Sequence, residues 1–299
     1  MKKLFISIAV TGMALAMGAC GSKKDAADSN GSAANGEATE AVANAEDNTW
    51  IWDFPRDVKF DAKPGQYAFA YFDFEQNAST SEDMLKEWIH YYLVKIESVG
   101  DKKSTVEFRD KKHEIDNAFI IPIPEGETAK VGDYVLGYRP KAQNEMYRGY
   151  VTNASDPASP EVTIVDGGAS KKDGNINIAD MNTGNKLEPG TFFVLKEGEW
   201  MPGMSIVVTE DNEKKVATII NVSGDKVLAL LDKENLRAYK RSDCKLMAVK
   251  PNIKLGDEIT GLWAFTFQDG FKVKKFKDGF YLVEKYGDAV MSNFEVIKE

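Results

Sequence analysis

The sequence predicts an all-β protein in which tandem small antiparallel β-barrels follow a disordered N-terminal tether. Three observations support this prediction. Apolar and polar residues alternate with a period of two over most of the chain after Trp50. Glycine-containing turns separate these short runs, and helical spacing is rare. Similar openings recur four times at intervals of 53 to 71 residues, which indicates repeated structural units.

The first twenty residues have the three parts of a secretory leader. Two lysines supply positive charge, residues 4–15 are mostly apolar, and small residues precede Cys20. The apolar run is short and interrupted by polar residues, so it is poorly suited to span a bilayer. The stretch Met17-Gly18-Ala19-Cys20 resembles the lipobox of bacterial lipoproteins. This resemblance implies that residues 1–20 are a signal peptide and that lipidated Cys20 becomes the mature N-terminus.

An alternative is an ordinary signal peptide that is cleaved after Ala19, which would leave Cys20 as a free thiol. Under the lipoprotein interpretation, Gly21 stands where an Asp would retain the protein on the inner membrane. We therefore expect a lipid-anchored protein of the cell envelope, held at the outer membrane through Cys20.

Composition limits the partners and the cross-links. The 299-residue chain has a net charge of −9, which becomes −11 when Lys2 and Lys3 leave with the signal peptide. A net acidic chain without a basic run is poorly suited to bind nucleic acid, so no such partner is expected. With Cys20 lipidated, Cys244 has no partner for a disulfide within the chain. We expect Cys244 to be a small buried residue rather than a reactive thiol.

Residues 21–48 are rich in Ala, Ser, Gly, Asn, Asp and Glu, and they predict a disordered linker. Ordered structure is expected to begin near Trp50. Four similar segments then follow, each with a glycine after Pro or an aliphatic residue and before a predicted strand. The openings are Lys63-Pro64-Gly65, Lys130-Val131-Gly132, Met201-Pro202-Gly203 and Lys254-Leu255-Gly256.

Tight turns are predicted at 99–102, 223–226 and 277–280, each between two strand-like runs. A unit of about 50 to 70 residues with such hairpins predicts a small, closed or partly closed barrel. The pattern resembles Tudor-like and Src-homology-3-like small barrels. The predicted barrels have the bounds 49–126, 127–198, 199–250 and 251–299.

The first two units carry insertions, where binding is expected because loops on rigid scaffolds often carry function. Residues 76–87 have a weak helix-start signal, which predicts one short helix near 80–90. The second unit contains two polar loops, at 153–160 and at 166–174.

Aromatic residues are the candidate ligand-binding residues. The Tudor-like resemblance implies a cage for methylated cations, formed first by Trp263 and Phe271 and then by Tyr138 and Tyr147. We favour a core role over a cage for these aromatics, because Trp263, Phe265 and Phe267 alternate and would share one buried face.

No residue pattern indicates catalysis, so no catalytic residue, metal site or cofactor is expected. The two histidines, His90 and His113, have no metal-ligand spacing around them. The oxygen-rich run 173–180 indicates a polar turn rather than a calcium loop. Acidic residues are numerous, yet none forms a recognisable pair.

These observations favour a non-enzymatic envelope protein that presents tandem barrels to a protein, peptide or glycan ligand. One alternative is a glycan or cell-wall hydrolase that uses unidentified carboxylates. Another is an assembly subunit of an envelope complex, which an exposed apolar patch on one barrel would support.

Overall fold

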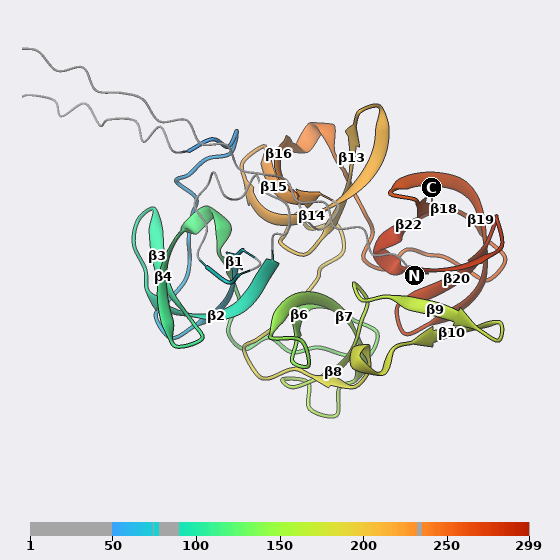
Figure 1. Cartoon of the computed structure of the whole chain (residues 1–299), viewed down its shortest axis with the longest axis horizontal. Helices are drawn as coiled ribbons and strands as arrows, with labels where there is room; N and C mark the ends of the chain where they lie inside the picture. The colour runs from blue at the N-terminus through green and yellow to red at the C-terminus, as the bar shows by residue number, and fades with distance from the viewer. Residues whose placement is uncertain (1–49, 74, 78–89, 232–234, 299) are drawn as a thin grey trace, which may run out of the picture. The chain divides into compact units, whose positions relative to one another are not determined.

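A computed structural model describes residues 50–73, 75–77, 90–231 and 235–298 (Figure 1). Within these ranges the chain forms curled antiparallel sheets, and the helical elements are short 3₁₀ turns. The predicted all-β class with small antiparallel barrels is therefore confirmed. The predicted linker, Cys20 and residues 78–89 of the predicted short helix lie outside the described residues, and a strand begins at His90.

The first and second repeats share one 10-stranded sheet. The strands of the first repeat are β1 (Tyr67–Phe72), β2 (His90–Ser98), β3 (Lys103–Phe108), β4 (Lys111–Asp116) and β5 (Ile121–Pro122). Those of the second are β6 (Tyr134–Arg139), β7 (Glu145–Asn153), β8 (Glu161–Ile164), β11 (Asn185–Lys186) and β12 (Phe193–Val194). The two halves join where β2 pairs with β7 at Tyr92 and Glu145.

The third and fourth repeats each form a 5-stranded sheet with the same strand order. The third contains β13 (Ser205–Glu210), β14 (Glu213–Ser223), β15 (Lys226–Leu231), β16 (Asn235–Lys240) and β17 (Lys245–Leu246). The fourth contains β18 (Glu258–Trp263), β19 (Thr266–Lys277), β20 (Phe280–Glu284), β21 (Asp288–Ser292) and β22 (Val296–Ile297). The predicted turns at 99–102, 223–226 and 277–280 connect β2 to β3, β14 to β15 and β19 to β20. The two 5-stranded sheets fall within the predicted bounds 199–250 and 251–299, whereas the 10-stranded sheet spans the first two predicted units. The division into four domains stays a prediction.

The four opening glycines have one structural role. Their φ angles are 88°, 89°, 85° and 88° in chain order, a conformation that glycine adopts without a steric penalty. Each glycine N–H donates to a carbonyl of its own repeat's second strand, at 2.7 to 2.9 Å. The four donor–acceptor pairs are Gly65–Ile96, Gly132–Val151, Gly203–Ile219 and Gly256–Val273. The repeated opening therefore ties the first turn to the second strand.

The second strand of every repeat also contains a register shift close to that contact. The shifts lie between Ile96 and Ser98, Val151 and Asn153, Ile219 and Asn221, and Val273 and Lys275. A β-bulge bends its strand and increases the local twist. The bend allows the second strand to pair with a neighbouring strand along each of its two edges while the sheet curls. The curled sheets give the small-barrel form.

One predicted loop has regular structure. The polar segment 166–174 contains β9 (Ala169–Lys172), which forms a two-stranded hairpin with β10 (Asn175–Ile178). Lys171 pairs with Asp288 at 2.7 Å, and Lys275 Nζ donates to the Gly174 carbonyl at 2.7 Å. Part of this predicted polar loop is therefore a hairpin in contact with the fourth repeat, and ligand binding at this loop stays a prediction.

Candidate functional site

The four predicted ligand-binding aromatics occupy different environments. Phe271 is 1% exposed in the core of the fourth repeat, and Tyr138 is 5% exposed in the second. Tyr147 is partly buried, and its hydroxyl donates to Glu145. Trp263, at the end of β18, is 39% exposed and lies 6.3 Å from Phe271 between ring centroids. Of the four, Trp263 alone presents a large part of its ring to solvent.

Trp263 belongs to an exposed aromatic patch, which we define as Trp263, Phe265 and Tyr286. Phe265 is 74% exposed, Tyr286 is 66% exposed, and the rings of Trp263 and Tyr286 lie 6.1 Å apart. The expectation that Trp263 and Phe265 lie on a core face is wrong. The β18–β19 hairpin turns at Ala264 and Phe265, so strand alternation ends at Trp263.

A lysine occupies the polar side of this patch. The Lys285 ammonium lies 4.8 Å from the centroid of Tyr286 and 5.1 Å from that of Phe271. It also donates to the Asp269 carbonyl at 2.6 Å. The attraction between a cation and these ring faces is therefore already satisfied within the chain. This arrangement disfavours a methylated-cation cage built from Trp263 and Phe271.

The turn that carries Phe265 has an unfavourable sequence for its backbone. Ala264 and Phe265 have φ angles of 49° and 69°. The equivalent turn of the third repeat has the same conformation with Asp211 and Asn212, which tolerate it better. For other L-residues the left-handed region costs roughly 1–2 kcal/mol each. Such a local cost motivates a functional hypothesis for the residues that incur it.

The sequence patterns did not identify Tyr286 as a surface aromatic, and they placed Phe265 on a core face. Tyr286 lies next to Gly287, in the turn between β20 and β21. An aromatic residue beside a turn glycine is poorly placed for burial. This local pattern is the sequence signal that could have identified Tyr286 as exposed. The two turns come from different hairpins of one repeat, and folding brings the Tyr286 ring to 6.1 Å from that of Trp263.

A polar cluster, separate from the aromatic patch, lies where the first and second repeats join. His90 Nδ1 lies 2.7 Å from Glu145 Oε1, and the Tyr147 hydroxyl donates to Glu145 Oε2 at 2.9 Å. Burial is the largest single influence and would raise the pKa of Glu145, but the hydrogen bonds with His90 and Tyr147 and the charge attraction to His90 and Arg139 together lower that pKa. Burial raises the pKa of Tyr147, so its hydroxyl remains a donor.

A glycosidase-type general acid needs a carboxyl group with a raised pKa. Six carboxyl groups of the described residues have a pKa below its ordinary value, so none of these six is such an acid. These residues are Asp53, Glu97, Asp133, Glu145, Asp257 and Asp288. The described structure therefore gives no specific support to the hydrolase alternative.

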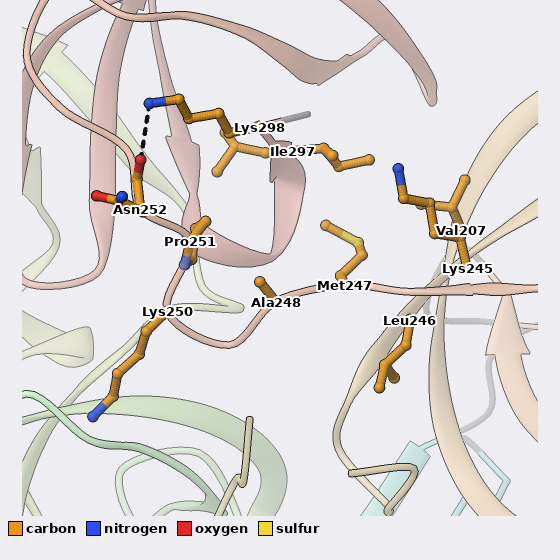
Figure 2. A pocket seen from close by; sticks show the side chains of 11 residues that line it. Val207, Lys245, Leu246, Met247, Ala248, Lys250, Pro251, Asn252, Ile297 and Lys298 are labelled. Atoms are coloured by element: carbon orange, nitrogen blue, oxygen red, sulfur yellow. Dashed lines mark hydrogen bonds between the residues drawn. The ribbon is translucent and has the colours of Figure 1, made fainter. Parts of the chain in front are cut away.

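A groove of about 400 Å³ lies between β17, the connector that follows it, and β22. Figure 2 shows Val207, Met247 and Ile297 directed toward its centre, while Lys298 reaches the Asn252 carbonyl at 3.0 Å. Lys298 also pairs with Asp257, and Lys250 pairs with Asp133. The groove thus has apolar walls, and these two lysines are engaged by neighbouring acids.

The single cysteine in the described part of the chain is half-buried. Its Sγ donates to the Lys240 carbonyl at 3.3 Å, and burial raises the pKa of the Cys244 thiol to about 11. Thiolate is the reactive form, so this environment disfavours reactivity.

Comparison with known proteins adds no assignment: no family model matches the chain, and no match is found among curated proteins. In the described part of the chain, no group of three or more His, Cys, Asp or Glu side chains is placed to hold a metal ion. The same residues include no helix with the length and apolarity needed to cross a membrane.

Proposed function

We propose that the protein is a lipid-anchored, non-enzymatic interaction protein of the cell envelope, tethered through Cys20. Its partner is a protein with an apolar pocket, and the aromatic patch is the contact surface. The observation that carries this proposal is the exposure of three aromatic side chains at turns of the fourth repeat. The rings of Trp263 and Tyr286 lie 6.1 Å apart, and Phe265 lies two residues after Trp263 in the chain.

The chemistry of the patch favours a protein partner. Trp and Tyr are enriched among the residues that dominate protein–protein binding energy, and exposed apolar patches mark such surfaces. Phe265 has no hydrogen-bonding group and projects from a turn, so only an apolar pocket would desolvate it favourably. The turn itself does not require Ala264 and Phe265, because Asp and Asn tolerate its positive φ angles better.

Photo-crosslinking in intact cells tests the contact. A photoreactive amino acid replaces Phe265 in one strain and Leu255, which is 68% exposed on the same repeat, in the control strain. We expect one defined protein adduct from position 265 and none from position 255. Trp263→Ala with Tyr286→Ala should remove that adduct. An adduct that persists in this variant, or the same adduct from both positions, would refute the proposal.

Membrane fractionation with a labelled fatty acid tests the anchor. The wild-type protein should incorporate label and sediment with membranes, whereas Cys20→Ser should do neither. A Cys20→Ser protein that stays membrane-bound would contradict the lipid anchor. Protease treatment of intact cells then locates the folded part. Cleavage without breaching the outer membrane places the partner outside the cell, and cleavage only after breaching it places the partner in the periplasm.

A further inference from the structure

A separate cavity of about 510 Å³ lies between the second and fourth repeats, and no residue of the aromatic patch lines it. Its size is within the range of small-molecule sites, which hold mostly apolar walls and a few polar groups. The side chains that line it include those of Tyr134, Tyr150, Lys250, Lys254, Phe276 and Tyr281.

The walls are a continuous series of aromatic rings. Tyr134 and Tyr150 have centroids 5.2 Å apart, Tyr150 and Phe276 are 6.0 Å apart, and Phe276 and Tyr281 are 5.0 Å apart. Phe276 is 44% exposed at the mouth, whereas Tyr134 and Tyr281 are buried deeper. The 79° angle between Tyr150 and Phe276 makes a corner of two ring faces. The C–H faces of a saturated ring, such as a sugar, can pack against such a corner.

Phenol hydroxyls supply hydrogen bonds inside the cavity. Among the hydrogen bonds of the described residues, none uses the hydroxyl of Tyr134 or Tyr150. The Tyr281 hydroxyl is only 3.5 Å from Asn293 Oδ1, which is a weak contact. Burial raises the pKa of Tyr134, and raises that of Tyr281 to about 12, so both stay protonated donors at neutral pH.

The charge of the cavity opposes that of the whole chain. Its described lining contains Lys250 and Lys254 and no acidic residue, although the chain has a net charge of −9. Lys250 Nζ pairs with Asp133 at 2.8 Å. Lys254 is exposed at the rim, and among the described residues its ammonium has no hydrogen bond or ion pair. The rim therefore complements an anionic group.

We infer that this cavity binds an acidic sugar, with its ring against Tyr150 and Phe276 and its carboxylate at Lys254. The ring hydroxyls accept from the phenol groups at the base. A free sugar acid and the terminal uronate of a glycan share this chemistry. The inference is independent of the proposed protein partner, because the two sites share no residue.

Calorimetric titration of the purified full chain tests the inference with D-glucuronate, D-glucose and benzoate. We expect glucuronate to bind at least tenfold more tightly than glucose, which lacks the carboxylate, and than benzoate, which lacks the hydroxyls. A uronate-terminated oligosaccharide that binds tenfold more tightly than free glucuronate would identify a glycan as the source. Equal affinity for the two would identify the free acid.

Two variants test the assigned contacts. Lys254→Glu should weaken glucuronate binding at least tenfold without unfolding the chain, because Lys254 is exposed. Tyr150→Phe should weaken it severalfold and leave benzoate unaffected. Lys186→Glu, an exposed lysine on β11 outside the cavity, is the matched control. The inference fails if glucose or benzoate binds as tightly as glucuronate, if no probe binds in the millimolar range, or if Lys254→Glu and Lys186→Glu behave alike.

Discussion

Arg148 Nη2 lies 2.6 Å from Asp166 Oδ1, and the guanidinium joins three repeats. Arg148 is 4% exposed on β7 of the second repeat. Its Nη1 donates to Ser205 Oγ of the third repeat at 2.5 Å, and its Cζ lies 3.9 Å from the ring centroid of Phe294 in the fourth. A buried charge needs both a partner and further hydrogen bonds, and Arg148 has them from separate parts of the chain.

Replacing Arg148 with Met should destabilise the protein by about 3–5 kcal/mol, because Asp166, whose side chain is 13% exposed, would lose its ion pair with the guanidinium. Urea unfolding measures the change. Arg148→Met with Asp166→Leu should be less destabilised than Arg148→Met alone, since no isolated charge remains. Arg241→Met, at an arginine over the Trp200 ring, is the control and should cost below about 1 kcal/mol. Equal losses at Arg148 and Arg241 would show that the buried ion pair has no special role.

The Ala264-Phe265 turn should gain stability when it receives the third repeat's turn sequence. Ala264→Asp with Phe265→Asn is expected to add about 1 kcal/mol to the free energy of unfolding, because Asp and Asn tolerate positive φ. The reciprocal change, Asp211→Ala with Asn212→Phe, should lose a similar amount of stability. A destabilised Asp-Asn variant would mean that Phe265 has a structural role.

The opening glycines should differ in their tolerance of alanine. At Gly256 an added Cβ meets no heavy atom within 4 Å, so only the left-handed φ opposes Gly256→Ala, at about 1 kcal/mol. At Gly203 the Cβ would lie 2.9 Å from Leu195 Cδ2 and 3.1 Å from Leu136 Cβ. Overpacking is added there, so Gly203→Ala should cost about 3 kcal/mol. Thermal unfolding of the two variants distinguishes these cases, and equal shifts in Tm would contradict them.

Asp288 should make stability depend on acid pH. Hydrogen bonds from Lys171 and Lys274 lower the pKa of Asp288 from 3.8 to about 2. Because the folded pKa is the lower one, the unfolded chain takes up the proton first as pH falls. The contribution is thus complete above about pH 4 and is lost as pH falls through about 2. The difference in urea midpoint between wild type and Asp288→Asn should shrink over this window, and a constant difference would contradict the prediction.

Local sequence signals predicted the repeated elements well because their causes are local. The opening glycines marked a backbone that requires positive φ, and the turns at 99–102, 223–226 and 277–280 connect strands as expected. The candidate site was harder to predict. Strand alternation placed Phe265 on a core face, but the chain turns at that residue, and Tyr286 comes from a different hairpin. Phe271 and Tyr138 are buried by neighbours distant in sequence.

The sequence by itself determined the all-β class, the positions of the repeated turns and the prediction of a lipid anchor at Cys20. These depend on residue types within a few positions of one another. Only the tertiary structure decided which aromatics are exposed, that β9 and β10 pack on the fourth repeat, and that Arg148 joins three repeats. The physical reason is that burial and ion pairing depend on groups brought together by folding, such as Arg148 and Phe294, and no local pattern encodes that proximity.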